Sequence, residues 1–240
     1  TSKGYVLPSN LTPLDNLIKG LKTANLWNRF DSIHVSALVG NSETHNNFRK
    51  LNLKNPSGQE RLFSSSGLTL NANGGIQANG VNGYIDHVTL INTYINYKQN
   101  NAGVIFVKTT DGINLFTGNR TNTPINTNIA INGNNNEYQR LNSEGSGVFA
   151  NGSGFGAIGM SRSVSTQQLF FNKNIQTNLN YNSTSLGGFP FTQFRTSSSS
   201  YYAGDELCVL VGSSYTQAEF NTFRGLFNTY LTQSGLPAIA

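Results

Sequence analysis

Apolar residues near the start of the chain recur at helical spacing. Leu14, Leu17 and Leu21 lie three or four positions apart and form one stripe. The stripe follows Thr12-Pro13, in which Thr12 can cap a helix and Pro13 has the backbone angle that suits its first turn. This pattern predicts a helix near residues 13–30.

The other end of the chain carries a second apolar stripe. It follows Thr216 and Glu219, which have the spacing of a capping box, with Tyr215 and Phe220 placed as a hydrophobic staple across it. Gly235 then marks the end of the helical pattern. We therefore predict a second helix near residues 217–233. The buried stripe consists of Phe220, Phe223, Phe227, Tyr230 and Leu231.

Between the two predicted helices, short β-rich runs alternate with clusters of Gly, Asn and Ser. About eleven runs occur, at residues 34–39, 68–70, 90–97, 104–108, 113–116, 129–131, 148–150, 155–160, 168–171, 191–195 and 207–211. Few of them alternate with helical segments, so a parallel α/β sheet is not expected. The pattern predicts an all-β fold, an antiparallel β-sandwich or jelly roll with short N- and C-terminal helices. We expect one domain over residues 12–240, preceded by an N-terminal extension of residues 1–11.

Charge is scarce and scattered. The chain has 16 Lys and Arg against 11 Asp and Glu, a net charge of +5, and only 11% charged residues, where about a quarter is usual. The only adjacent basic pair is Arg49-Lys50, whereas nucleic-acid surfaces need clustered Lys and Arg. No apolar run approaches the length of a membrane helix. We expect neither a nucleic-acid nor a membrane partner.

Residues that usually bind metals are isolated. The three histidines, His34, His45 and His87, show no metal-binding spacing. The single cysteine, Cys208, lies in an apolar run and is expected to be a buried strand residue. We therefore predict no metal site and no cofactor. The best local alternative is a calcium loop at Asp111-Gly112 with Asn114, for which a β-turn is the simpler interpretation.

Glycoside hydrolysis would need two carboxylates facing each other about 5–10 Å apart. The 11 acidic residues are dispersed along the chain. The one close pair, Asp205-Glu206, is adjacent and should point to opposite faces of a strand. We predict no catalytic residue. The alternative left open is a two-carboxylate site assembled from distant strands.

Four segments, in this order, carry a resemblance to a known family. They are Ile18 to Ile33 with Leu26-Trp27 inside it, Asn52-Leu53-Lys54-Asn55-Pro56, Gly75 to Asp86, and Thr216 to Gly235. The third ends in Gly80-Val81-Asn82-Gly83-Tyr84-Ile85-Asp86, where the two glycines allow a tight turn before Tyr84. Over about residues 12 to 235, the chain resembles the concanavalin A-like lectin/glucanase domains of bacteriophage virion proteins. It departs from their pattern at His87, where a Thr is usual.

The resemblance implies a non-enzymatic structural protein of a bacteriophage virion: a fibre, spike, decoration or tail component with a lectin-like domain. The implied location is the virion. The implied partners are other virion proteins and host cell-surface carbohydrate, and a homo-oligomer is expected. Two alternatives remain, a tail-associated glycoside hydrolase and a secreted bacterial adhesin.

Sugar binding would rest on aromatic faces that stack on sugar rings, with Asn and Ser bonding to hydroxyls. The candidates are Tyr94, Tyr97, Tyr138, Tyr201 and Tyr202, all expected to be exposed. Tyr94 and Tyr97 should fall on opposite faces of one strand, so at most one of them can share a surface with the others. The predicted glycan-binding set is Tyr97, Tyr138, Tyr201 and Tyr202.

Overall fold

A computed structural model describes most of the chain. The described residues are 11–39, 43–58, 60–71, 73–109, 115–117, 127–132, 136–143, 147–150, 156–172, 175–186, 188, 190–195 and 201–239. Their helices are α1 (Thr12–Thr23), α2 (Glu43–Arg49) and α3 (Gln217–Gln233), with short 3₁₀ turns η1 (Trp27–Arg29) and η2 (Ile91–Thr93). Their strands are β1 (Phe30–Val35), β2 (Leu38–Val39), β3 (Leu62–Phe63), β4 (Leu68–Leu70), β5 (Asn73–Gly74), β6 (Ile76–Asn79), β7 (Ile85–Leu90), β8 (Ala102–Lys108), β9 (Leu115–Thr117), β10 (Thr127–Asn132), β11 (Asn136–Leu141), β12 (Gly147–Ala150), β13 (Gly156–Val164), β14 (Gln167–Asn172), β15 (Ile175–Leu179), β16 (Pro190–Gln193), β17 (Ala203–Glu206) and β18 (Cys208–Gly212).

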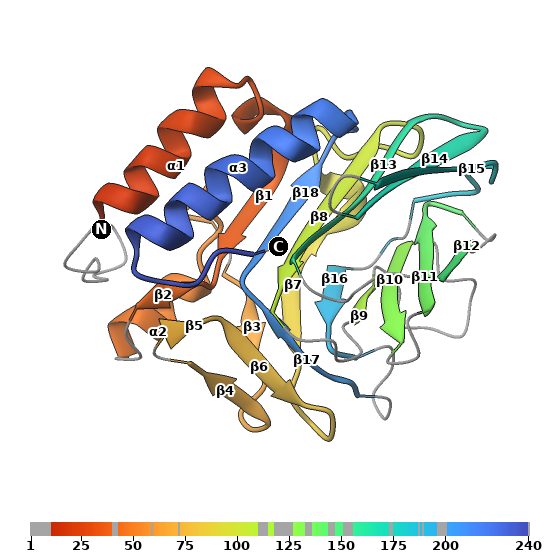
Figure 1. The fold of residues 1–240 in the computed structure, drawn as a ribbon. Coiled ribbons are helices and arrows are strands. Elements are labelled where there is room, and N and C mark those ends of the chain that lie inside the picture. The colour runs from red at the N-terminus through yellow and green to blue at the C-terminus, as the bar shows by residue number, and fades with distance from the viewer. Residues whose placement is uncertain are drawn as a thin grey trace.

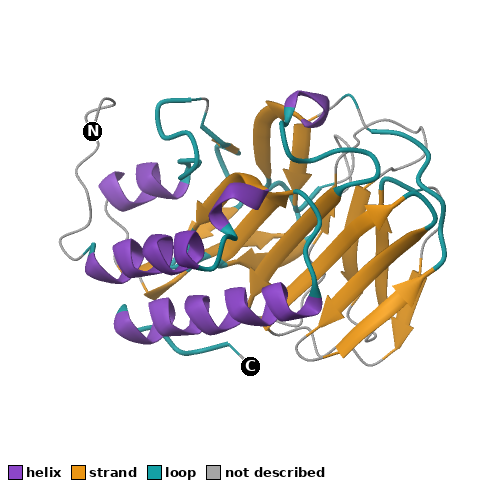
Figure 2. Cartoon of the chain, turned by 90° about the horizontal axis from the view of Figure 1, so that it is seen from above, coloured by secondary structure: helices purple, strands orange, loops and turns teal. Residues whose placement is uncertain are grey.

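Two large sheets form a sandwich, and helices α1 and α3 cover the outer face of one of them (Figures 1 and 2). That sheet has six strands in the order β1-β18-β8-β13-β14-β15, and the other has seven in the order β12-β11-β10-β9-β16-β7-β3. Two small sheets, β17-β6-β4 and β2-β5, lie beside them. Every strand pair between described residues is antiparallel. The predicted antiparallel sandwich with terminal helices is confirmed.

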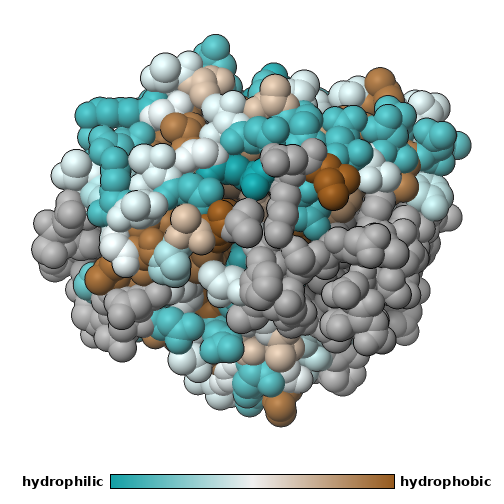
Figure 3. All heavy atoms as spheres, viewed as in Figure 1, coloured by the Kyte–Doolittle hydropathy of each residue, from teal (hydrophilic) through white to brown (hydrophobic). Residues whose placement is uncertain are grey.

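The central strands β8 and β18 of the six-stranded sheet are buried on both faces. In β8, Ile105 and Val107 pack under the helices, while Val104 and Phe106 pack between the two sheets. Strand β18 does the same, which explains why its sequence is continuously apolar instead of alternating. Cys208 is buried in β18, as predicted. Figure 3 shows that polar residues make up most of the described surface on one face of the molecule.

The two helices match their predictions to different degrees. At α3 the capping box of Thr216 and Glu219 is present, and the rings of Tyr215 and Phe220 stack with centroids 6.2 Å apart. At α1 the predicted Thr12 cap is wrong, because Thr12 is the first helical residue and no side chain caps the helix. The predicted extension to residue 30 is also wrong. Asn25 has a left-handed backbone (φ 57°), which ends the helix before the η1 turn.

The prediction of a strand over residues 90–97 is also wrong. Strand β7 ends at Leu90, and the chain continues through η2 into a loop. Strands β14 and β15 form an antiparallel pair in which Asn172 lies opposite Ile175. The calcium candidate at Asp111, Gly112 and Asn114 lies outside the described residues. No helix within the described part of the chain is long and apolar enough to cross a membrane.

We expect Gly83→Ala to destabilise the fold by about 1–3 kcal/mol. A Cβ atom at Gly83 would overlap the carbonyl oxygen of Gly67, which belongs to the facing backbone and cannot move aside like a side chain. Chemical denaturation would measure the change in the free energy of unfolding. Gly188→Ala is the matched control, because a Cβ there meets no atom within 4 Å; equal effects of the two substitutions would refute the steric argument.

Candidate functional site

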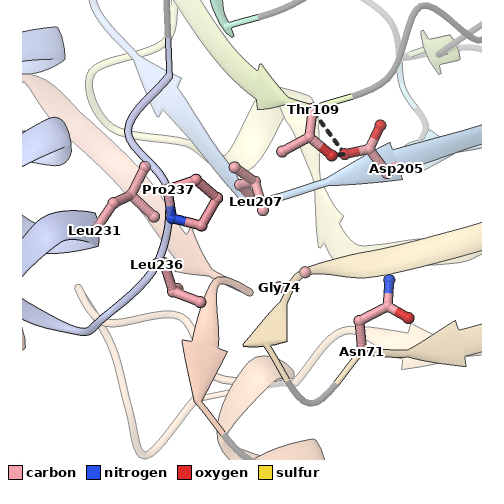
Figure 4. Close-up of a pocket in the computed structure, with 9 residues that line it drawn as sticks. Asn71, Gly74, Thr109, Asp205, Leu207, Leu231, Leu236 and Pro237 are labelled. Carbon is pink, nitrogen blue, oxygen red and sulfur yellow. Dashed lines mark hydrogen bonds between the residues drawn. The ribbon is translucent and has the colours of Figure 1, made fainter.

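A hollow of about 470 Å³ lies where the segment after α3 meets β17 and the β5 turn. We call it the Asp205 hollow. Figure 4 shows that its walls differ in chemistry: leucine and proline side chains gather on one side, and polar side chains on the other. The apolar wall is Leu207, Leu231, Leu236 and Pro237, and the polar wall is Asn71, Gly74, Gly75, Thr109 and Asp205.

The carboxylate of Asp205 is held in a fixed position. Its Oδ2 accepts hydrogen bonds from the backbone N of Thr109 at 2.6 Å and from the Thr109 hydroxyl at 2.7 Å (Figure 4). Asp205 lies on β17, and only 4% of its surface is exposed. The neighbouring Glu206 contacts Arg61 instead, so the prediction that the two acids point to opposite faces is confirmed.

A buried arginine organises the polar rim of the hollow. Nη2 of Arg49 donates to the carbonyl oxygens of Asn71 at 2.7 Å and Gly74 at 3.3 Å. Its Nε donates to the carbonyl oxygen of Ser36 at 2.9 Å, which ties the rim to the segment after β1. Burial lowers the pKa of Arg49 to about 10. Arg49 therefore acts as a positioning residue for the rim.

A buried ion pair lies behind the hollow. Arg61 and Glu206 are almost fully buried, and Nη1 of Arg61 lies 2.7 Å from Oε2 and 2.9 Å from Oε1 of Glu206. Nη2 of Arg61 donates to the carbonyl oxygen of Arg49 at 2.6 Å and to the hydroxyl of Ser36 at 3.0 Å. The Ser36 hydroxyl donates to Glu206. The two arginines, the glutamate and the serine thus form one network.

Two buried histidines adjoin this network. The rings of His34 and His87 meet edge to face, with centroids 4.9 Å apart. Nδ1 of His34 donates to the carbonyl oxygen of Leu51 at 2.8 Å. Burial, and then the positive charge of Arg61, lower the pKa of both histidines well below its usual value. Both rings are therefore neutral at pH 7.

The predicted tyrosines do not form one surface. Tyr97 is fully buried and Tyr94 nearly so, and their rings, 6.5 Å apart, pack together between the sheets. The expectation that these two are exposed on opposite strand faces is therefore wrong. It failed because the loop after η2 turns both rings inward, and the Tyr97 hydroxyl donates to Asn142 at 2.8 Å.

The other three candidates remain predictions. Tyr138 lies in β11, opposite Ala130 and Val148, and its side chain is outside what the structure describes. Tyr201 and Tyr202 are half-buried, and the Tyr201 ring lies 6.2 Å from that of Tyr84. Of the predicted residues whose side chains are described, Tyr97, Tyr201 and Tyr202, none lines the Asp205 hollow.

Sequence reasoning missed the hollow because four distant segments build it. The described lining residues come from positions 71, 74 and 75, from 109, from 205 and 207, and from 231, 236 and 237, and no segment has a recognisable motif. Of the described residues that line the hollow, Asp205 alone carries a carboxylate. Within the part of the chain that the structure describes, no three His, Cys, Asp or Glu residues are grouped to hold a metal ion.

Comparison with known proteins gives structural likeness only. No family model and no curated protein matches the sequence. A mutant of HCR/D superposes on 83% of this chain and 53% of its own, with a TM-score of 0.56 and 11% identity. A mutant of Trypanosoma rangeli sialidase that displays trans-sialidase activity covers 93% of this chain and 39% of its own, with a TM-score of 0.53 and 8% identity. This chain thus spans about half or less of their length.

At these identities the likeness concerns the fold. The superposition on HCR/D extends over most of this chain. The predicted fold class, an antiparallel β-sandwich with N- and C-terminal helices, is confirmed.

Proposed function

We propose that this chain is a lectin-like domain that binds a glycan in the Asp205 hollow. The observation that carries the proposal is the division of the hollow into an apolar and a polar wall. A sugar ring is divided in the same way, because its C–H face is apolar and its hydroxyls both donate and accept hydrogen bonds. Leu231, Leu236 and Pro237 would pack against the ring, while the Asp205 carboxylate and the Asn71 amide would bond to hydroxyls. The volume falls within the range of small-molecule sites.

The hollow supports binding without hydrolysis. Glycoside hydrolysis uses two carboxylates on either side of the bond that breaks. Among the described residues the lining holds one carboxylate, and Glu206, the nearest acid in sequence, is turned away and paired with Arg61. We therefore propose that the domain is not an enzyme. Incubation with the bound glycan should release no new reducing ends, and their release would favour the hydrolase alternative.

We expect Asp205→Ala to weaken glycan binding at least about tenfold, the effect of losing a well-placed charged hydrogen-bond partner. Glycan-array screening followed by calorimetry on the best ligand would measure it. Asn71→Ala is a second variant that leaves the hydrogen bonds between Thr109 and Asp205 intact. Asp15→Asn, at an exposed acid on α1, is the matched control. Unchanged binding in both hollow variants, or no glycan bound by the wild type, would overturn the proposal.

For the biological setting we propose attachment of a bacteriophage virion to host surface carbohydrate. The support is the resemblance of four sequence segments to virion proteins, and the lectin-like sandwich is compatible with it. Mass spectrometry of purified phage particles should detect the chain, and light scattering should show a homo-oligomer. Detection only among secreted bacterial proteins would favour the adhesin alternative.

A further inference from the structure

A second hollow has a volume of about 440 Å³. It opens at the end of the six-stranded sheet that lies away from the Asp205 hollow. We call it the amide groove, after Asn28, Asn52, Asn55 and Asn96 in its walls. Thr89 and Asp31 also line it. None of these residues belongs to the Asp205 hollow.

The walls of the groove are held rigidly by side-chain bonds to the backbone. The carboxylate of Asp31 accepts from the backbone N atoms of Ile95, Asn96 and Tyr97 at 2.8–3.1 Å. Across the groove, Oδ1 of Asn52 accepts from the backbone N atoms of Ile33 and Lys54, both at 3.0 Å. Nδ2 of Asn52 donates to the carbonyl oxygen of Asp31, also at 3.0 Å. A ligand would therefore meet a preorganised surface and lose little affinity in ordering it.

The two charged groups of the groove are already engaged. The amide of Asn96 adds a further bond to Asp31 at 3.1 Å, so the carboxylate is surrounded by N–H donors. Nζ of Lys54 donates to the carbonyl oxygen of Trp27 at 2.7 Å and lies 4.6 Å from the centre of the Trp27 ring. The other polar side chains of the lining include the amides of Asn28 and Asn55 and the hydroxyl of Thr89. Amides and hydroxyls both donate and accept, as sugar hydroxyls do.

A small cavity that shares lining residues with the groove contains a buried donor. A polar cavity of about 10 Å³ shares Asn52, Thr89 and Tyr94 with the groove and is also lined by Arg61. Arg61 is 1% exposed, and its Nε has no hydrogen-bond partner among the described residues. An oxygen atom in this cavity would satisfy it, and the space suits a single water-sized group. One oxygen atom, of a water molecule or of a ligand hydroxyl, would therefore accept from Arg61 beside the groove.

The two hollows are far apart on the sheet. Phe30, in the amide groove, pairs with Gly212 at one end of β18. Cys208, at the other end, pairs with Val107, two residues before Thr109 of the Asp205 hollow. Strands rise about 3.3 Å per residue, so the sites are separated by roughly 15 Å and cannot hold the same sugar unit.

We propose that the amide groove is a second glycan site, selective for uncharged sugars, so that one chain binds two glycan segments at opposite ends of its sandwich. This inference extends the proposed function but concerns different residues. Its tests therefore give separate answers.

Calorimetry with maltohexaose, cellohexaose and chitohexaose as neutral probes, and trigalacturonic acid as the anionic probe, would test the proposal. The groove variants are Asn28→Ala and Thr89→Ala, the hollow variant is Asp205→Ala, and Asn178→Ala on the exposed edge strand β15 is the control. On the Asp205→Ala variant, we expect calorimetry to show one remaining binding site for a neutral probe. Each groove variant should weaken that site at least tenfold, and the control should not.

The outcomes separate the two proposals. Binding abolished by Asp205→Ala and unchanged by the groove variants would overturn the second site and leave the first. Binding lost only in the groove variants would support the second site and overturn the first. Tighter binding of the anionic probe than of every neutral one would overturn the selectivity, and no binding of any probe to the wild type would overturn both.

Discussion

Replacement of Glu206 by alanine is expected to lower the free energy of unfolding by about 3–5 kcal/mol, the usual cost of removing one partner of a buried ion pair. The guanidinium of Arg61 would stay buried without its counter-charge, because the side chain is 1% exposed and contacts β17, the last residue of α2 and the segment after β1. Single domains are stable by about 5–15 kcal/mol, so this loss is a large fraction of the total.

Urea denaturation of the wild type and three variants would measure the effect. The double variant Arg61→Met/Glu206→Leu should be more stable than Glu206→Ala, because no charge remains buried. The control Asp15→Ala breaks the exposed pair of Asp15 with Lys19, 2.6 Å apart, and should change stability by only about 0.5 kcal/mol. A Glu206→Ala protein as stable as this control would contradict the network described for Arg61.

Acidification from pH 6.5 to 5 is expected to destabilise the fold steeply. The pKa of His34 and of His87 in the folded chain lies well below the value of 6.5 in the unfolded chain, because of burial and the charge of Arg61. Below pH 6.5 the unfolded chain therefore binds protons that the folded chain does not, so unfolding is favoured as pH falls. The stabilisation is fully present above pH 6.5. As the pH falls, the free energy of unfolding decreases by up to about 1.4 kcal/mol per pH unit for each histidine.

Urea midpoints recorded at several pH values between 7.5 and 5 would show this loss. The double variant His34→Asn/His87→Asn should have a flatter profile, since neither side chain then titrates. His45→Asn, on α2, retains both buried rings and should keep the steep profile. A wild-type free energy of unfolding that is constant over this range would contradict the burial of two neutral histidines.

The parts of the fold predicted from sequence are those that depend on local pattern. The capping box of Thr216 and Glu219 involves residues three apart, and the opposed directions of Asp205 and Glu206 follow from the geometry of a strand. The predictions failed where a distant contact outweighed local preference. The loop after η2 is drawn towards Asp31, more than 60 residues away in sequence, and this contact turns Tyr97 into the core.

The sequence by itself determined the antiparallel sandwich and its terminal helices, because hydrophobic spacing and end signals act within a few residues of chain. The tertiary structure alone decided which polar residues meet. Arg49 joins Ser36 to Asn71, and Thr109 holds Asp205 across 96 positions of sequence. Such contacts exist only once the sheets have packed, since burial makes each charged or polar group find a partner wherever the fold supplies one. Both candidate sites are products of that packing.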